Sequence, residues 1–499
     1  MDLPFIIEFR LWPKRPRSTA LMTQLAPANR LAGAAIFVLL AVATGTCAGV
    51  GVSVGIASSD RPAAAGELRE ERYFDWASSE ASAKRHASRR QNLIELLRAA
   101  GGGVFLTPSR DGFSSGETFR QLDDFFYFTG LELPNSVLAI DADLGHSQIF
   151  APRRDARFEN PARPNDFPGR PLAGDPEIED RAGIEVRPIE QLDRLALEWE
   201  AARQTLWLNL GRHGDARPRE SDFVQSWSPE QALLMHLQRA YPKASVASAF
   251  ASVARLRMVK DEAELATIRR ACTITGAGIL AAASKIRVGI DERHLEAEME
   301  AEWKRQGAQR RAFDSIIKSG PNSLWPWRIL ASHYDRRNRA LEAGDLVIFD
   351  VGCELDHYAS DVGRTFPASG KFSEPQAKRL RMVTAVTDAI IDAARPGRTL
   401  RELQAIAEAH IPEDERPHMQ AGSFFGHHIG LNVGDPSILD EPLQAGMVFT
   451  VEPWYYNHDE GIAVFLEENI AITADGAENL TGWLPRTPEA LERLVGQGN

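Results

Sequence analysis

Five residues in the C-terminal half of the chain are of the types that bind metal ions. They are Asp350, Asp361, His427, Glu452 and Glu467. The carboxylates lie in apolar, strand-like runs that include residues 347–351, 447–452 and 462–467. An ionised carboxylate that is buried without a partner is strongly unfavourable, so such groups are usually paired or bound to metal. Two divalent cations would neutralise the charge of the four carboxylates. This balance predicts a two-metal centre.

The spacing of these residues predicts two hairpins with one histidine between them. Asp350 and Asp361 are eleven residues apart, which suits two strands whose side chains converge on one point. Glu452 and Glu467 flank a second turn, at residues 457–461. His427 lies between the hairpins with glycine on both sides, and glycine allows close approach of the backbone.

The ligand types indicate which metals and which chemistry to expect. A set of carboxylates with one imidazole favours hard or borderline cations such as manganese, cobalt or zinc. Paired metals of this kind lower the pKa of a bridging water and polarise a carbonyl group, which is the general scheme of two-metal hydrolysis. A lone Asp or His is more often structural, but five such residues at hairpin spacing favour a hydrolytic centre.

Length and composition set the broad class of protein. A chain of 499 residues is too long for one ordinary core, so two domains and an extension are expected. Its 43% hydrophobic and 25% charged residues are typical of a soluble globular protein. The net charge of -12 argues against a nucleic-acid partner, which would need a basic face. The three cysteines form no disulfide framework.

The N-terminal region resembles a targeting segment. Residues 31–58 carry no charged side chain and follow a stretch that is rich in Arg and Lys. This pattern is typical of an export signal or an N-terminal membrane anchor. We therefore expect a periplasmic, extracellular or membrane-anchored protein rather than a cytoplasmic one, with membrane contact only through residues 31–58. Whether the segment is cleaved stays open.

The remaining chain alternates between strand-like and helical runs. Strands are expected at 104–107, 136–140, 147–151 and 205–210, with helices at 86–100, 190–203 and 229–239. Helix pairs at 261–286 with 291–305, and at 374–394 with 399–410, precede the two hairpins and suggest an internal duplication. We expect a signal peptide or anchor plus linker over 1–66, an α/β domain over 67–255 and a catalytic domain over 256–499.

Several longer stretches resemble the pita-bread metallopeptidases, and within them the aminopeptidase P (Xaa-Pro aminopeptidase) branch. The matching stretches in the C-terminal half are 344–354, 358–367, 446–453 and 478–481. In the first domain, residues 124–130, which read DFFYFTG, resemble the signature of the N-terminal domain of this branch. The resemblance implies an α/β (α+β) protein in which an N-terminal α/β domain precedes a C-terminal pita-bread (creatinase/aminopeptidase-like) domain.

The resemblance also implies a role for each site residue. Asp350 would bind one metal alone, and Asp361 and Glu467 would bridge both metals. His427 and Glu452 would complete the shell of the second metal, and Glu452 would also act as general base and acid. His333 matches the substrate-side histidine of the family and would hold the peptide carbonyl. The cofactors implied are two divalent ions, with manganese favoured over cobalt and zinc, and the assembly implied is a homo-oligomer, either a dimer or a tetramer.

Three positions depart from the family pattern. The family places histidines at the positions of Ser423 and Gly434, and an arginine at the position of Phe465. These changes leave the metal ligands intact but alter the substrate site. His428 or His458 could compensate for the lost imidazoles.

The function expected is a two-metal exopeptidase that releases the N-terminal residue from peptides with proline at the second position. An alternative of the same chemistry is an Xaa-Pro dipeptidase, which is a prolidase-like enzyme. A third alternative is a pita-bread binding module with impaired catalysis. Retention of all five ligands favours an enzyme, because a binding module has no physical reason to keep four clustered acids.

Overall fold

The computed structural model describes residues 83–112, 119–153, 179, 183–211, 227–324, 338–419 and 426–497. These residues all belong to one compact unit, Leu68–Asn499. The predicted targeting segment at 31–58, the substrate-side residue His333 and the departure at Ser423 lie outside the described residues. No helix in the described parts of the chain is both long and apolar enough to cross a bilayer.

The N-terminal half folds around one six-stranded sheet with the order β4-β3-β2-β1-β5-β6. Its strands are β1 (Val104–Pro108), β2 (Val137–Asp141), β3 (His146–Ala151), β4 (Glu185–Pro188), β5 (Thr205–Leu208) and β6 (Ser245–Ser248). β1 pairs antiparallel with β2 and parallel with β5, so the sheet is mixed. The four strands expected from the sequence are confirmed, whereas the short and more polar β4 and β6 were not predicted.

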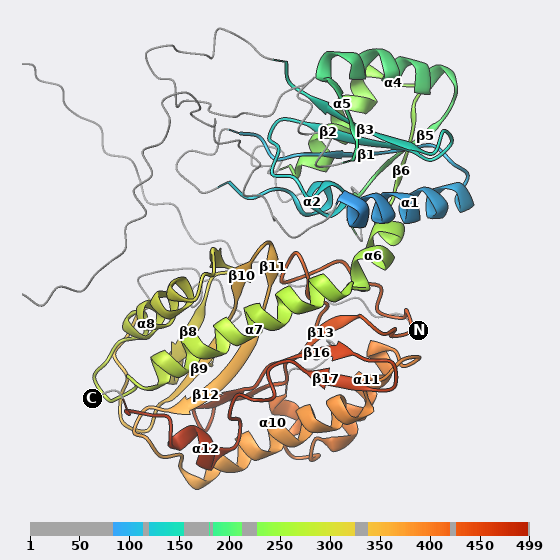
Figure 1. The fold of residues 1–499 in the computed structure, drawn as a ribbon. Helices are drawn as coiled ribbons and strands as arrows, with labels where there is room; N and C mark the ends of the chain where they lie inside the picture. Colours follow the sequence, from blue (N-terminus) through green and yellow to red (C-terminus); the bar gives the residue numbers. More distant parts are fainter. Residues whose placement is uncertain are drawn as a thin grey trace, which may run out of the picture. The chain divides into compact units, whose positions relative to one another are not determined.

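Helices cover both faces of this sheet, as Figure 1 shows. They are α1 (Ala83–Ala99), α2 (Asp123–Thr129), α4 (Leu192–Ala201) and α5 (Pro229–Ala240). Successive side chains of a strand point to opposite faces. Accordingly, Phe105 of β1 packs in the core that contains α1 and α2, whereas Val104 and Leu106 pack in the core that contains α4 and α5.

Helix α6 (Phe250–Met258) leads into the C-terminal half, where two helix pairs are formed. The first pair is α7 (Glu262–Ala283) and α8 (Glu292–Arg305), and the second is α10 (Glu374–Ala393) and α11 (Leu400–His410). Asp261 caps α7 by accepting from Ala263 N and Glu264 N, and Asp291 caps α8 by accepting from His294 N. The predicted helix pairs are therefore confirmed. The short α12 (Pro488–Glu492) follows the last strand.

Several small sheets make up the rest of the C-terminal half. Their strands are β7 (Arg310–Arg311), β8 (Ile316–Ser319), β9 (Leu346–Val351), β10 (Cys353–Leu355), β11 (Tyr358–Ala359), β12 (Val362–Pro367), β13 (Val448–Val451), β14 (Trp454–Asn457), β15 (Ile462–Phe465), β16 (Glu468–Ile472) and β17 (Ala477–Asn479). Short 3-10 helices lie at Ile189–Gln191, Gly320–Asn322 and Arg416–His418. α7 packs against β10 and β12 (Figure 1), and α10 packs against β14 and β15. Both helix pairs and these strands share the largest apolar core.

Candidate metal centre

The first hairpin brings two of the predicted ligands together. β9 and β12 pair antiparallel, and Asp350 on β9 lies opposite Gly363 on β12. Asp361 directly precedes β12. Every residue of both strands is buried, and Asp350 and Asp361 are each only 4% exposed. The apolar strands therefore hold both carboxylates away from bulk water, as the sequence predicts.

The second hairpin supplies the two glutamates. Glu452 directly follows β13, and Glu467 lies between β15 and β16. β14 and β15 pair between them, with Trp454 opposite Phe465. β14 and β15 run antiparallel, and Glu452 lies before the first strand while Glu467 lies after the second. Both glutamates are therefore at the same end of the hairpin, opposite its turn.

One backbone bridge joins the two hairpins. Gly363 N donates to Glu467 O at 3.2 Å, and Glu467 N donates to Gly363 O at 3.1 Å. A Cβ atom on Gly363 would lie 2.3 Å from Cε1 of Phe465 and 2.8 Å from Cβ of Glu467. Only glycine lets the strands approach this closely, so the bridge depends on the absence of a side chain at position 363.

The predicted ligands converge where the hairpins meet. One ligand atom each from Asp361, His427 and Glu467 lies within 4.8 Å of the other two. His427 Nε2 is 3.5 Å from Asp361 Oδ2 and 3.5 Å from Glu452 Oε1. Asp350, opposite Gly363 in the first hairpin, lies close enough to Asp361 and Glu452 for their charges to raise its pKa. The structure thus brings together all five residues that were predicted from the sequence.

The backbone fixes the ring of His427. Its Nδ1 lies 3.2 Å from the carbonyl oxygen of His428, to which a protonated Nδ1 donates. That tautomer leaves the lone pair of Nε2 directed at the acids, which is the usual arrangement of a metal-binding histidine. Thr450 holds the main chain of His427, because Thr450 Oγ1 accepts from His427 N at 3.0 Å and Thr450 N donates to His427 O at 2.8 Å.

The electrostatics of the cluster favour added positive charge. Burial, reinforced by the neighbouring acids, raises the pKa of Asp350 and Glu467 well above their usual values. Burial also raises the pKa of Glu452 to about 7, although the charge of His427 opposes this shift. For His427, burial disfavours the imidazolium, but the hydrogen bond to Asp361 and the charge of Glu452 outweigh it and raise its pKa to about 9.

The protein supplies little to neutralise these acids. Within the described part of the chain, Asp361 and Glu452 pair with His427, and none of the four carboxylates has an ion pair with any other cation. Asp361 Oδ1 and both carboxylate oxygens of Glu467 are buried without a hydrogen-bond partner. Orphaned carboxylate oxygens beside an imidazole nitrogen are the donors that a divalent cation binds. The residues present therefore fit a metal site.

One supporting residue was not predicted. Arg364 is fully buried, and its guanidinium donates to the carbonyl oxygens of Gly363 at 2.7 Å and Glu467 at 2.9 Å. It also donates to the carboxylate of Glu468 at 2.9 Å. Arg364 thus ties the two hairpins together behind the ligands. An arginine inside the apolar strand 362–367 was a signal that could have identified it.

The described positions that depart from the family pattern lie in different environments. Phe465 is fully buried, and its ring stacks on Trp454 with centroids 3.7 Å apart. Gly434 is exposed, in the loop that follows His427. His428 is buried, neither of its ring nitrogens has a hydrogen-bond partner, and burial together with the charge of Lys260 lowers its pKa to about 3. His428 is therefore a neutral core residue, and it does not replace a lost substrate-side imidazole.

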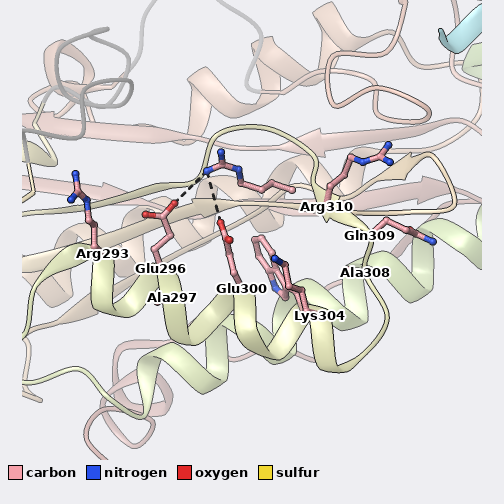
Figure 2. Close-up of a pocket in the computed structure, with 10 residues that line it drawn as sticks. Arg293, Glu296, Ala297, Glu300, Lys304, Ala308, Gln309 and Arg310 are labelled. Atoms are coloured by element: carbon pink, nitrogen blue, oxygen red, sulfur yellow. Dashed lines mark hydrogen bonds and ion pairs between the residues drawn. The ribbon is translucent and has the colours of Figure 1, made fainter. Parts of the chain in front are cut away.

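Two cavities occur elsewhere in the described residues. One, of about 480 Å³, lies over α8 and is lined by charged side chains such as Glu296, Glu300 and Arg311. Both of its acids are paired, because Arg311 lies 3.5 Å from Glu296 and 3.9 Å from Glu300. Figure 2 shows Glu296 and Glu300 on successive turns of the same helix. A second cavity, of about 610 Å³, is lined by residues that include Arg120, Arg257 and Asn432. None of the five candidate ligands lines either cavity.

Comparison with known proteins assigns the chain to a family. Residues 266–474 match metallopeptidase family M24, and residues 86–204 match the aminopeptidase P N-terminal domain. The chain is 30% identical to the Xaa-Pro aminopeptidase of Escherichia coli over 458 residues, which cover 84% of this chain and 98% of that protein. It is 36% identical to the Xaa-Pro dipeptidase of Pyrococcus furiosus over 234 residues, which cover 45% of this chain and 64% of that protein.

The solved structures agree with this assignment. Aminopeptidase P from E. coli with the inhibitor Pro-Leu superposes with a TM-score of 0.67 at 26% identity, covering 84% of this chain and 99% of that one. The expected architecture, an N-terminal α/β domain followed by a pita-bread domain, is thereby confirmed. On the combined evidence of domain order, fold and sequence, the chain belongs to the aminopeptidase P branch of metallopeptidase family M24.

Proposed function

We propose that the protein is a metal-dependent Xaa-Pro aminopeptidase, which releases the N-terminal residue from peptides with proline at the second position. The main support for this proposal is the buried cluster of four acids and His427. Among the described residues, His427 is the only cation that forms an ion pair with these acids. The likeness to the E. coli Xaa-Pro aminopeptidase over almost the whole of that protein supports the substrate class.

The proposed centre holds two divalent ions. Asp350 would bind the first ion, His427 and Glu452 the second, and Asp361 and Glu467 both. The bridging role is supported because Asp361 lies 3.5 Å from His427 Nε2 and interacts electrostatically with Asp350. When bound, the ions supply Lewis acidity that activates water and polarises the scissile carbonyl. Carboxylate-rich ligation favours manganese, with cobalt and zinc as competitors.

Glu452 is the residue that we propose moves the proton. A general base works best when its pKa lies near the operating pH, and burial places the pKa of Glu452 at about 7 in the metal-free fold. Its carboxylate would take a proton from water and deliver it to the nitrogen of the departing peptide. His333, by the resemblance, would contact the substrate carbonyl.

The test is hydrolysis by the purified protein, stripped of metal and reloaded with Mn²⁺. We expect release of the first residue from an Xaa-Pro-Yaa tripeptide, loss of activity with a chelator and loss of activity in Glu452→Gln. An Xaa-Pro dipeptide assayed in parallel separates the aminopeptidase from a prolidase-like enzyme, which the likeness to the P. furiosus dipeptidase keeps as the second candidate. If the protein binds Mn²⁺ yet cleaves neither peptide, it is a binding module instead.

We also propose that the apolar segment 31–58 directs the protein to export, as its composition predicts. Cell fractionation of a C-terminally tagged full chain tests this proposal. Recovery in the periplasm, the medium or the membrane would support export, and recovery in the cytoplasm alone would contradict it. Sedimentation of the same protein would test the proposed dimer or tetramer.

A further inference from the structure

Arg120 and the signature stretch that follows it, residues 124–130, together contact both segments that carry the candidate ligands. Arg120, just before this stretch, donates from Nε to Glu354 Oε2 at 2.6 Å and from Nη1 to Asp123 Oδ1 at 2.8 Å. Its Nη2 donates to the carbonyl oxygen of Leu431 at 2.5 Å. A single guanidinium thus contacts three separate parts of the chain.

Two of these contacts flank the metal centre. Glu354 lies between Asp350 and Asp361 on the first hairpin, and its other carboxylate oxygen accepts from Arg310 at 2.8 Å. Leu431 lies four residues after His427. The side chain of Glu354 is 6% exposed and that of Arg120 is 20% exposed, so this ion pair is largely shielded from water. Arg120 therefore links the hairpin that carries Asp350 and Asp361 to the segment that carries His427.

A buried ion-pair network reinforces the link on the side of His427. Asp435 accepts from Arg257 Nη2 at 2.5 Å and lies 3.3 Å from Lys260 Nζ. Arg257 also pairs with Asp124 at 2.7 Å and with Asp123 at 3.2 Å. Because Asp123 is a partner of Arg120 as well, alternating charges run from Glu354 to Asp435 without a break.

Aromatic packing reinforces the link on the side of the hairpin. The ring of Phe126 stacks on His357 with centroids 3.9 Å apart, and His357 Nε2 lies 2.6 Å from Glu132 Oε1. His357 occupies the turn between Asp350 and Asp361. The turn is therefore held by Phe126 and Glu132, and the loop after His427 is held by Arg120 of the same domain.

We propose that Arg120 is a positioning residue of the metal centre, which sets the separation between the Asp350–Asp361 hairpin and His427. The inference rests on the proposed function, because it assumes that these residues bind metal together. Ligands must be held within about 0.5 Å of their productive geometry by the groups behind them. Loss of such an outer partner typically lowers metal affinity about 10–100-fold. If Arg120 only joined the domains, its loss would lower stability and leave metal affinity unchanged.

The test compares Arg120→Gln and Arg120→Lys with the wild-type protein in a calorimetric titration of the metal-free chain with Mn²⁺. We expect Arg120→Gln to weaken Mn²⁺ binding by at least about 10-fold and to raise the Mn²⁺ concentration that gives half-maximal activity. Arg120→Lys keeps the charge, but its compact ammonium lacks the planar fork that reaches these separated acceptors, so we expect an intermediate loss of Mn²⁺ affinity. The matched control is Arg269→Gln, which breaks a bidentate pair with Glu478 at 3.2 and 2.7 Å and should leave Mn²⁺ affinity unchanged.

Two outcomes would overturn the proposal. The first is an Arg120→Gln protein with a lowered melting temperature but wild-type Mn²⁺ affinity. The second is an equal loss of affinity in Arg269→Gln. If Arg120→Gln does not fold, Glu354→Gln interrupts the same link from the other side and must give the same rise in the Mn²⁺ dissociation constant. Wild-type protein that binds Mn²⁺ but cleaves no peptide would end the proposed function and leave this inference intact.

Discussion

Gly363 and Glu467 exchange two backbone hydrogen bonds, and this bridge brings the two ligand hairpins into contact. Gly363 lies opposite Asp350 in the first hairpin, and Glu467 is itself a candidate ligand from the second. The distance between the acids of the two hairpins is therefore set by the main chain, which is stiffer than a side-chain contact. Changes that separate these strands should affect metal binding as well as stability.

Gly363→Ala tests the bridge directly. The new methyl group would lie 2.3 Å from the ring of Phe465, so the strands must separate or the ring must move. Overpacking of this kind typically costs about 1–3 kcal/mol of unfolding free energy. We expect that loss in urea unfolding, together with weaker Mn²⁺ binding. Gly476→Ala is the control, because its Cβ would meet only Thr473 Oγ1, at 3.9 Å. Wild-type Mn²⁺ affinity in Gly363→Ala would show that the bridge does not set the site.

Arg364→Met tests the buried arginine behind the ligands. Removing the guanidinium leaves the carboxylate of Glu468, which is fully buried, without its main cation. Breaking a buried ion pair from one side costs about 3–5 kcal/mol. We expect a loss of this size in urea unfolding, and partial recovery when Glu468→Gln removes the uncompensated charge. If Arg364→Met alone is as stable as the wild type, Arg364 does not hold the two hairpins together.

The stability that the metal-free cluster contributes should fall as pH rises. Burial raises the folded-state pKa of Glu452 from 4.5 to about 7, and its neighbouring acids raise that of His427 from 6.5 to about 9. In both windows these two groups hold more protons in the folded state than in the unfolded state, so their contribution to the unfolding free energy decreases with pH between about 4.5 and 9.

Bound metal should reverse this trend, because cations replace the protons that the cluster holds. We expect the rise in melting temperature caused by Mn²⁺ to grow between pH 5 and pH 9. Thermal unfolding with and without Mn²⁺ across that range measures it. In Glu452→Gln the decline of the metal-free protein between pH 4.5 and 7 should be smaller. A Mn²⁺ effect that does not vary with pH would mean that the metal does not displace these protons.

Asp361→Asn should give the largest loss of metal among the single acid variants. Asp361 lies 3.5 Å from His427 Nε2, and its charge raises the pKa of Asp350, so it interacts with both sides of the centre. The loss of Mn²⁺ affinity should exceed the roughly 10–100-fold typical of an outer partner. Metal analysis of the purified variant measures it. Asp440→Asn is the control, since Asp440 is exposed and pairs with Arg401 on the surface. Equal metal content in both variants would remove Asp361 from the site.

The sequence by itself identified the five candidate ligands and most of the elements that carry them. Charged side chains in apolar runs and the eleven-residue spacing of Asp350 and Asp361 are local signals, and helix caps such as Asp261 and Asp291 are local as well. Strands β4 and β6 escaped prediction because they are short and lack a strong apolar alternation.

Only the tertiary structure decided how the ligand-bearing segments are held together. Arg120 lies 234 residues from Glu354 and 311 from Leu431, and Arg364 lies 104 residues from Glu468. Periodicity reports which side chains share a face of one helix or strand, so it carries no information about partners this distant. Those partners are chosen by the packing of whole elements. For that reason the candidate ligands could be found in the sequence, and the residues that hold their segments together could not.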